Sequence, residues 1–126
     1  MKIKFTSKTE QARDFLKKHN AEKEFILEES AATMYGCAIL DSAVVGVIGL
    51  HIGKYADRIK DFFILPEYRN RGIGTELLNS VLQASNKNTI TAFCPEQLKK
   101  MFIKANLKET RKQNKISFME LHRGGK

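Results

Sequence analysis

A basic, glycine-containing turn between a strand-like run and a helix-like run constrains this chain more than any other feature. The turn occupies residues 65–75, with the sequence LPEYRNRGIGT. Residues 61–65, which lead into it, form an aromatic and aliphatic run of strand character. After it, apolar residues recur at helical spacing, which predicts a helix from near Gly72 to about Asn86 that packs one face on a sheet.

A strand, a glycine-containing turn and a helix N-terminus together predict a binding site for a phosphate or a pyrophosphate. Backbone N–H groups at a helix N-terminus point outward, and the helix dipole adds partial positive charge there. Arg69 and Arg71 contribute two further charges. Because glycine has no Cβ, we expect Gly72 and Gly74 to let a large anion approach the backbone.

Two common nucleotide-binding patterns do not fit this chain. Gly72 and Gly74 begin like a dinucleotide fingerprint, but Leu77 stands where that pattern needs a third glycine. Residues 49–54 are one residue too short for a P-loop, and Tyr55 replaces the Ser or Thr that such a loop needs. The phosphate ligand is therefore expected to belong to another class.

Length and composition limit the class of protein. The 126 residues, 42% of them hydrophobic, predict a single domain at residues 1–123 with a disordered tail at 124–126. The longest apolar run, residues 43–50, is far shorter than a membrane span, and the N-terminus has no signal-peptide pattern. Cys37 and Cys94 have neither metal-ligand nor redox spacing, so we expect a cytoplasmic protein without a bound metal.

The charge balance raises nucleic-acid binding as a hypothesis. Lys and Arg number 22 against 14 Asp and Glu, a formal net charge of +8. The basic residues are densest at 99–115, where no helix-turn-helix, zinc-finger or RNP-like pattern accompanies them and aromatic residues do not alternate with them. We interpret these residues as the solvated faces of a helix and a hairpin, and we do not expect nucleic acid as a partner.

The rest of the chain reads as a regular series of strands and helices. A strand at 3–5 is followed by a capping box at 7–10 and a helix to about residue 20, whereas residues 21–33 fit either a helical turn or a strand. The remaining elements are a hairpin of 35–40 and 43–51 through Asp41-Ser42, strands at 57–65 and 89–94, a helix from Pro95 to Ala105 with Asn106 as left-handed cap, and a hairpin of 107–110 and 116–121.

The pattern Arg69-x-x-Gly72-x-Gly74, introduced by Leu-Pro-Glu-Tyr, closely resembles the acetyl-CoA signature of the GNAT superfamily of N-acetyltransferases. The order of predicted elements is similar to that family over essentially the whole chain. The resemblance implies an α/β fold of the α+β type, with a mixed, mostly antiparallel sheet of about six to seven strands and helices on both faces. It also implies that strands 61–65 and 89–94 run parallel and splay apart at their C-terminal ends, where the pantetheine arm enters.

By this resemblance the chain uses acetyl-CoA as its acetyl donor. The backbone N–H groups of Arg71 to Thr75 should hold the pyrophosphate, the edge of strand 61–65 should pair with the pantetheine amides, and an N–H near Ile64 should face the thioester carbonyl. The thioester is expected near Ile64, Leu65, Phe93 and Cys94. The expected CoA-binding residues are Phe63, Ile64, Leu65, Arg69, Asn70, Arg71, Gly72, Ile73, Gly74, Thr75, Phe93 and Phe102.

The residues that move protons are less clearly marked. Many relatives protonate the departing thiolate with a tyrosine in Leu-Tyr-x-x-x-Gly-Phe, but here the run is MFIKANL and Phe102 stands at that position. Pro95 replaces an asparagine that the family commonly has seven residues earlier. Either another group donates the proton, or the thiolate leaves into water, or the protein catalyses poorly. The groups considered are Tyr35, Tyr55, Tyr68 and Cys94.

Three residues are candidates for the base that deprotonates the amine. Asp57 and Asp61 lie on the strand before the signature and share one face by strand alternation. His51 ends the preceding strand, and histidine is a residue type that commonly acts as a general base. For each of the three, an ordinary surface position is the alternative. Tyr68 completes the set of catalytic candidates as a proton donor.

The acceptor is expected to be a primary amine of a small molecule or a peptide, acetylated by direct transfer. Glu22, Glu24, Glu28 and Glu29 crowd a connection that borders the acceptor cleft in this family, which favours a cationic acceptor; a solvated acidic loop is the alternative. The competing function is a catalytically weak GNAT-fold protein that binds CoA and regulates a protein partner. The sequence leaves a homodimer open.

Overall fold

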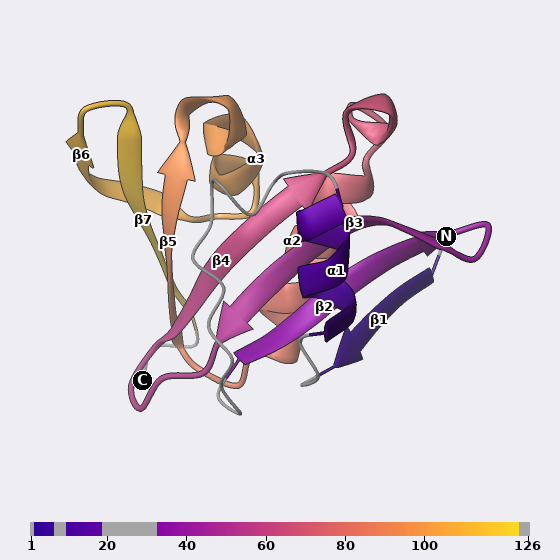
Figure 1. Ribbon diagram of the computed structural model, residues 1–126. Coiled ribbons are helices and arrows are strands. Elements are labelled where there is room, and N and C mark those ends of the chain that lie inside the picture. The colour runs from indigo at the N-terminus through magenta and orange to yellow at the C-terminus, as the bar shows by residue number, and fades with distance from the viewer. Residues whose placement is uncertain (1, 7–9, 19–32, 124–126) are drawn as a thin grey trace.

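The computed structural model describes residues 2–6, 10–18 and 33–123, which form one seven-stranded mixed sheet with helices on both faces (Figure 1). The strand order is β1-β2-β3-β4-β5-β7-β6, and only β4 and β5 pair in parallel. This confirms the predicted sheet. The strands are β1 (Lys2–Thr6), β2 (Thr33–Leu40), β3 (Ala43–His51), β4 (Asp57–Ile64), β5 (Thr89–Pro95), β6 (Lys108–Gln113) and β7 (Ile116–His122). The helices are α1 (Glu10–Lys18), α2 (Ile73–Ala84) and α3 (Lys99–Lys104), with 3-10 turns η2 (Pro66–Tyr68) and η3 (Glu96–Leu98).

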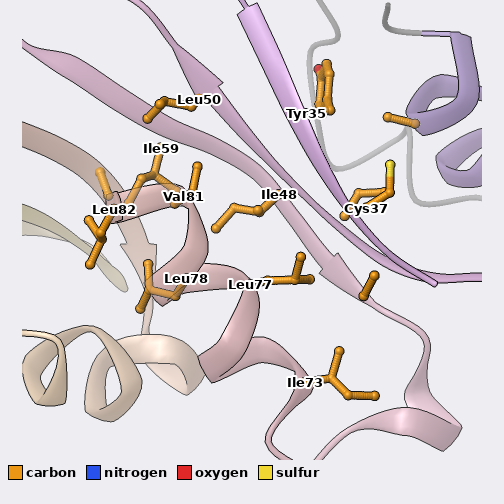
Figure 2. Close-up of a cluster of buried hydrophobic side chains, with 14 of the residues drawn as sticks. Tyr35, Cys37, Ile48, Leu50, Ile59, Ile73, Leu77, Leu78, Val81 and Leu82 are labelled. Carbon is orange, nitrogen blue, oxygen red and sulfur yellow. The ribbon is translucent and has the colours of Figure 1, made fainter. Parts of the chain in front are cut away.

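The helices divide the core into two layers. On one face, α1 packs Phe15 against Phe63 of β4, with the ring centroids 6.0 Å apart. Figure 2 shows Tyr35 and Cys37 on this side of β2, toward α1, and Ile48 on the opposite side, toward α2. The α2 residues that bury against that second face recur at helical spacing, as predicted: Ile73, Leu77, Leu78, Val81 and Leu82.

The turns that join these elements follow the local sequence closely. Asp41 and Ser42 both have positive φ angles, 51° and 67°, which suits the tight turn of a β-hairpin. Asn106 has a φ of 74°, so it adopts the left-handed conformation expected at the end of α3. In place of one helix from Pro95 to Ala105, the chain forms η3 and then the shorter α3.

The helix after the signature turn is also slightly shorter than predicted. It ends at Ala84 because Ser85 turns to an extended conformation, with ψ at 134°. Four sequence predictions lie outside the described residues: most of the capping box at 7–10, the end of the first helix, the segment 21–33 with its four glutamates except for Thr33, which begins β2, and the tail at 124–126.

Candidate active site

Strand β4 contains one extra residue opposite β3, which forms a β-bulge. Val47 lies opposite Phe63, but Gly49 lies opposite Lys60, so two steps on β3 match three on β4. Asp61 occupies the bulge with a φ of 53°, an unusual backbone conformation for a residue other than glycine. The bulge therefore interrupts the alternation of side chains along β4.

This interruption corrects the expectation that Asp57 and Asp61 share one face of the sheet. The Asp57 carboxylate accepts a hydrogen bond from the Ser85 hydroxyl at 2.6 Å, just beyond the end of α2. The Asp61 carboxylate accepts one from the Tyr35 hydroxyl at 2.7 Å, on the face that α1 covers. Strict alternation fails here because the bulge inserts an odd residue between them.

Asp61 is a buried carboxylate within a polar cluster. Besides the Tyr35 hydroxyl, the Lys60 ammonium lies 3.7 Å from its Oδ2 atom. A glycine makes this arrangement possible, since a Cβ at Gly49 would lie 3.0 Å from the Tyr35 ring and 3.1 Å from the Lys60 side chain. The cluster thus positions one carboxylate beside the bulge, with a donor and a cation to stabilise its charge.

The strands β4 and β5 separate soon after they meet. Their ladder contains only the pairs Asp57–Ile90, Arg58–Thr91 and Ile59–Ala92, after which β5 continues along β7 as far as Pro95. From Lys60 onward, one edge of β4 has no strand partner within the described part of the chain (Figure 1). The predicted splaying of the two strands is confirmed.

The N–H and C=O groups of Ile64 point toward this open edge. Its neighbour Leu65 donates its N–H to the Val45 carbonyl of β3 at 2.9 Å. In a strand, the N–H and C=O of one residue point to one edge and those of the next residue point to the other. Consistently, the Ile64 carbonyl accepts a hydrogen bond from Arg69 Nε at 2.8 Å. The Ile64 N–H, directed to the same edge, is therefore available to a carbonyl oxygen placed there.

The N-terminus of α2 is open at Gly72. Gly72 is the N-cap residue, with a φ of 84° and no side-chain cap, and a Cβ built on it would have no atom within 4 Å. Its carbonyl already accepts the first helical hydrogen bond, from Glu76 N at 3.1 Å. The first N–H groups of α2 have no partner inside the helix, so they can bind an anion.

Gly74 has a packing role that the sequence does not indicate. It is buried, and a Cβ on it would lie 2.9 Å from the Met101 methyl group and 3.5 Å from the Phe62 ring. The missing side chain thus lets α2 pack closely against α3 and β4. Gly72 remains the glycine at which an anion can approach from solvent.

The two arginines of the signature turn point in different directions. Arg69 donates to the Ile64 carbonyl, and its guanidinium lies 5.4 Å from the Phe63 ring centroid. Arg71 is exposed, and its guanidinium lies 5.4 Å from the ring centroid of Tyr68, which is half-buried in η2. Arg69 therefore links the turn to the end of β4, whereas Arg71 remains at the surface beside exposed Asn70 and Thr75.

Two of the catalytic candidates lie at the other end of β4. His51 is opposite Arg58, with its Nδ1 atom 3.3 Å from the Thr33 hydroxyl. Asp57 accepts hydrogen bonds from the Gly53 N–H at 3.1 Å and the Ser85 hydroxyl, and pairs with Lys87 at 3.2 Å. At ~3.3 Å per strand residue, both are about 20 Å from Ile64. Of the three candidates, Asp61 alone belongs to the stretch of β4 beyond its ladder with β5, and its carboxylate is directed to Tyr35 on β2.

Two phenylalanines expected near the thioester differ in exposure. Phe102 is buried on α3, with its ring centroid 6.2 Å from that of Phe62 in the bulge. Phe93 is 56% exposed on β5, just after the last pair with β4. Phe102 has no ionisable group, so it offers no proton to a ligand bound there.

Cys94, one of the groups considered for proton transfer, is buried next to Phe93. Burial raises the pKa of its thiol to about 11, and burial likewise raises the pKa of Cys37 to about 11. A nucleophilic cysteine needs a thiolate, and at pH 8 only about one Cys94 in a thousand would be ionised. This argues against Cys94 as a nucleophile.

We predict that both cysteines of the folded protein resist alkylation. At pH 8, iodoacetamide should leave native protein unlabelled for hours, whereas protein unfolded in guanidinium should gain two labels within minutes. Intact-mass spectrometry counts the labels. Rapid single labelling of native protein would contradict the prediction and would identify a reactive thiol.

The sequence did not reveal the contact between Tyr35 and Asp61. The two residues are 26 positions apart and come from β2 and β4. Tyr35 was named only as a replacement acid. A long-range hydrogen bond leaves no local sequence signal, and the bulge that aims Asp61 at Tyr35 leaves none either.

Two features are absent from the described residues. No group of three His, Cys, Asp or Glu side chains there could hold a metal ion. No described helix is long and apolar enough to cross a membrane.

Comparisons with known proteins agree with this fold. A model of the acetyltransferase (GNAT) family matches residues 4–99, while a direct comparison with curated protein sequences finds no match. The fold is similar to Campylobacter jejuni N-acetyltransferase PseH in complex with acetyl coenzyme A (TM-score 0.69, 16% identity, 98% of this chain and 100% of that one). It is also similar to Thermoplasma acidophilum PaiA N-acetyltransferase in complex with coenzyme A (TM-score 0.68, 16% identity, 97% of this chain and 99% of that one). A third similar structure is Escherichia coli ElaA (TM-score 0.74, 10% identity, 98% of this chain and 99% of that one).

Proposed function

Since this chain belongs to the GNAT acetyltransferase family, we propose that it transfers an acetyl group from acetyl-CoA to a primary amine. One observation supports this most strongly: the open N-terminus of α2 and the unpaired edge of β4 lie at the two ends of a single short turn. Arg69 joins them through the Ile64 carbonyl. A ligand with a pyrophosphate at one end and an amide-bearing arm at the other suits both features at once.

In this proposal the donor is bound largely by backbone groups. The N–H groups from Arg71 to Thr75 hold the pyrophosphate, and Arg71 adds its exposed charge. The pantetheine amides pair with the edge of β4 beyond Ile59, and the Ile64 N–H faces the thioester oxygen. That N–H stabilises the negative charge that develops on this oxygen when the amine attacks.

The base in this proposal is Asp61. The amine nitrogen forms a bond to the acetyl carbon, the carbon–sulfur bond breaks, and the proton lost by the nitrogen passes to the Asp61 carboxylate directly or through a water molecule. Tyr35 positions that carboxylate through its 2.7 Å hydrogen bond. The thiolate takes a proton from Tyr68 or from water. Acid and base are thus two different groups.

The test is the release of free CoA thiol from acetyl-CoA in the presence of a panel of primary amines. We predict that Asp61→Asn lowers kcat about 100-fold, as expected for the loss of a general base, and leaves the dissociation constant for acetyl-CoA unchanged. Asp41→Asn is the matched control, because Asp41 is exposed in the β2–β3 turn and asparagine tolerates its positive φ. Equal turnover by both variants would exclude Asp61 as the base.

A second function, a CoA-binding regulator with little catalysis, is supported by the burial of Phe102 at the family's tyrosine position. It predicts acetyl-CoA binding without amine-dependent thiol release across the whole panel. The panel includes spermidine to test the sequence expectation of a cationic acceptor, and amines that bear a carboxylate to test the alternative. Release that depends on one class of amine supports the enzyme.

A further inference from the structure

An aromatic row crosses β5, β7 and β6 where β4 and β5 separate. In the strand register Phe93 lies opposite Phe118, and Phe118 lies opposite Arg111. The two rings have centroids 5.2 Å apart, and the Arg111 guanidinium lies 5.0 Å from the Phe118 centroid. Phe93 is 56% exposed and nearby Ile116 is 42% exposed. Exposed hydrophobic side chains gathered on one face of a sheet can mark a ligand site.

This row lies on the same face of the sheet as Asp61. Arg58 is opposite Thr91, and Phe93 is two residues further along β5, so alternation places Phe93 on the face of Arg58. Lys60 is two residues beyond Arg58 on that same face, beside the Asp61 carboxylate. Phe93 and the proposed base therefore lie on one face of the sheet, on the two strands that separate beyond the β4–β5 ladder.

The surface beside the row is concave. Phe93, Arg111, Gln113, Asn114, Ile116 and Phe118 line an open hollow of about 230 Å³, which we call the aromatic hollow. Its volume suits one ring or branched apolar group with its substituents. Its walls are aromatic and aliphatic, its rim carries amides, and Arg111 provides its single full charge.

Arg111, the charged residue of the aromatic hollow, has no carboxylate partner among the described residues. Within the described chain, the acidic residues of this region pair elsewhere: Glu96 with Lys112 at 3.2 Å and Glu109 with Lys99 at 3.1 Å. Arg111 lies over the Phe118 ring and forms no ion pair with a described carboxylate. A guanidinium above an aromatic floor, with no carboxylate beside it, is complementary to an apolar group that carries a negative charge.

We propose that the aromatic hollow binds the far end of the acceptor, and that the acceptor is an amine whose far end is aromatic or branched apolar and bears a carboxylate. This inference rests on the proposed function, since it needs an acceptor at the open end of β4. With strands ~4.8 Å apart, Arg111 on β6 lies roughly 10 Å beyond Phe93 on β5. The carboxylate is therefore separated from the reacting nitrogen by several bonds.

The test uses ligands that fill the aromatic hollow without reacting. The CoA-loaded protein is titrated with 3-phenylpropionate and with its neutral analogue 3-phenylpropanol, followed by amide chemical shifts. We expect 3-phenylpropionate to bind at least tenfold more tightly than the alcohol and to shift the amides of Phe93 and Phe118. Arg111→Gln should remove that tenfold difference, whereas Lys115→Gln, which removes one charge from the adjacent turn, should preserve it. Phe93→Ala should weaken both ligands.

The outcomes separate this inference from the proposed function. Equal affinity for acid and alcohol, or no binding of either by protein that still binds acetyl-CoA, overturns the acceptor class alone. Failure of acetyl-CoA to bind overturns the proposed function first. Two other results also overturn the inference. One is binding of a single-stranded decauridylate at 0.15 M salt that is tighter than the binding of 3-phenylpropionate and is abolished by Phe93→Ala. The other is self-association of the protein that Phe93→Ala abolishes.

Discussion

Replacing Gly72 with valine should raise the dissociation constant for acetyl-CoA at least 100-fold. The new side chain would project from the N-cap of α2 into space that is open in the structure and that the pyrophosphate would occupy. Losing two charge-assisted contacts to backbone N–H groups, at about 1.5–3 kcal/mol each, accounts for an effect of this size. Calorimetric titration of CoA-free protein measures it.

The substitution also strains the backbone, and a control separates that effect. A φ of 84° costs a residue with a Cβ about 1–2 kcal/mol, which lowers the melting temperature without unfolding the protein. Asn114→Val imposes similar strain at a φ of 58° in the β6–β7 turn, away from α2. It should lower the melting temperature comparably and leave acetyl-CoA affinity unchanged. Equal affinity of both variants would refute the site.

Replacing Asp57 with alanine should lower the free energy of unfolding by about 3 kcal/mol, with a fall in melting temperature of roughly 10 °C. The Asp57 side chain is 1% exposed and accepts bonds from Gly53, Ser85 and Lys87. Removing it leaves a buried hydroxyl, a backbone N–H and a partly buried ammonium without their acceptor. Urea unfolding followed by circular dichroism measures the change.

The exposed pair of Glu96 and Lys112 supplies the control for Asp57. Because Glu96 is 58% exposed, Glu96→Ala should change stability by less than about 1 kcal/mol. This comparison also separates a structural role from a catalytic one. An Asp57→Ala variant that keeps wild-type stability but loses turnover would show that Asp57 acts in the chemistry and that its contacts contribute little.

The site could be predicted from sequence wherever its determinants are local. The strand, the glycine-containing turn and the helix start near Gly72 follow one another within residues 57–84, and each has its own composition signal. The hairpin at Asp41-Ser42 and the left-handed Asn106 were likewise local. The family model matches the segment that holds all of these except Asn106.

The features of the site that the sequence does not predict depend on contacts between residues far apart in the chain. A bulge is set by how β4 fits β3, so alternation along β4 alone placed Asp57 and Asp61 on the same face. Gly74 carries the same sequence signal as Gly72, yet it packs against Met101, which lies 27 residues later in the chain. The aromatic row needs the β5–β7 register to bring Phe93 beside Phe118. Neither spacing nor propensity encodes these pairings.

Amide chemical-shift mapping with acetyl-CoA tests the central claim most directly, and a chain of 126 residues is small enough for it. We predict saturable shifts concentrated at Gly72, Gly74 and Thr75 at the start of α2, and at Ile64 on the edge of β4. Amides at the β1–β2 end of the sheet should not move. A folded protein whose amides at α2 and β4 stay unchanged at saturating acetyl-CoA would contradict the account.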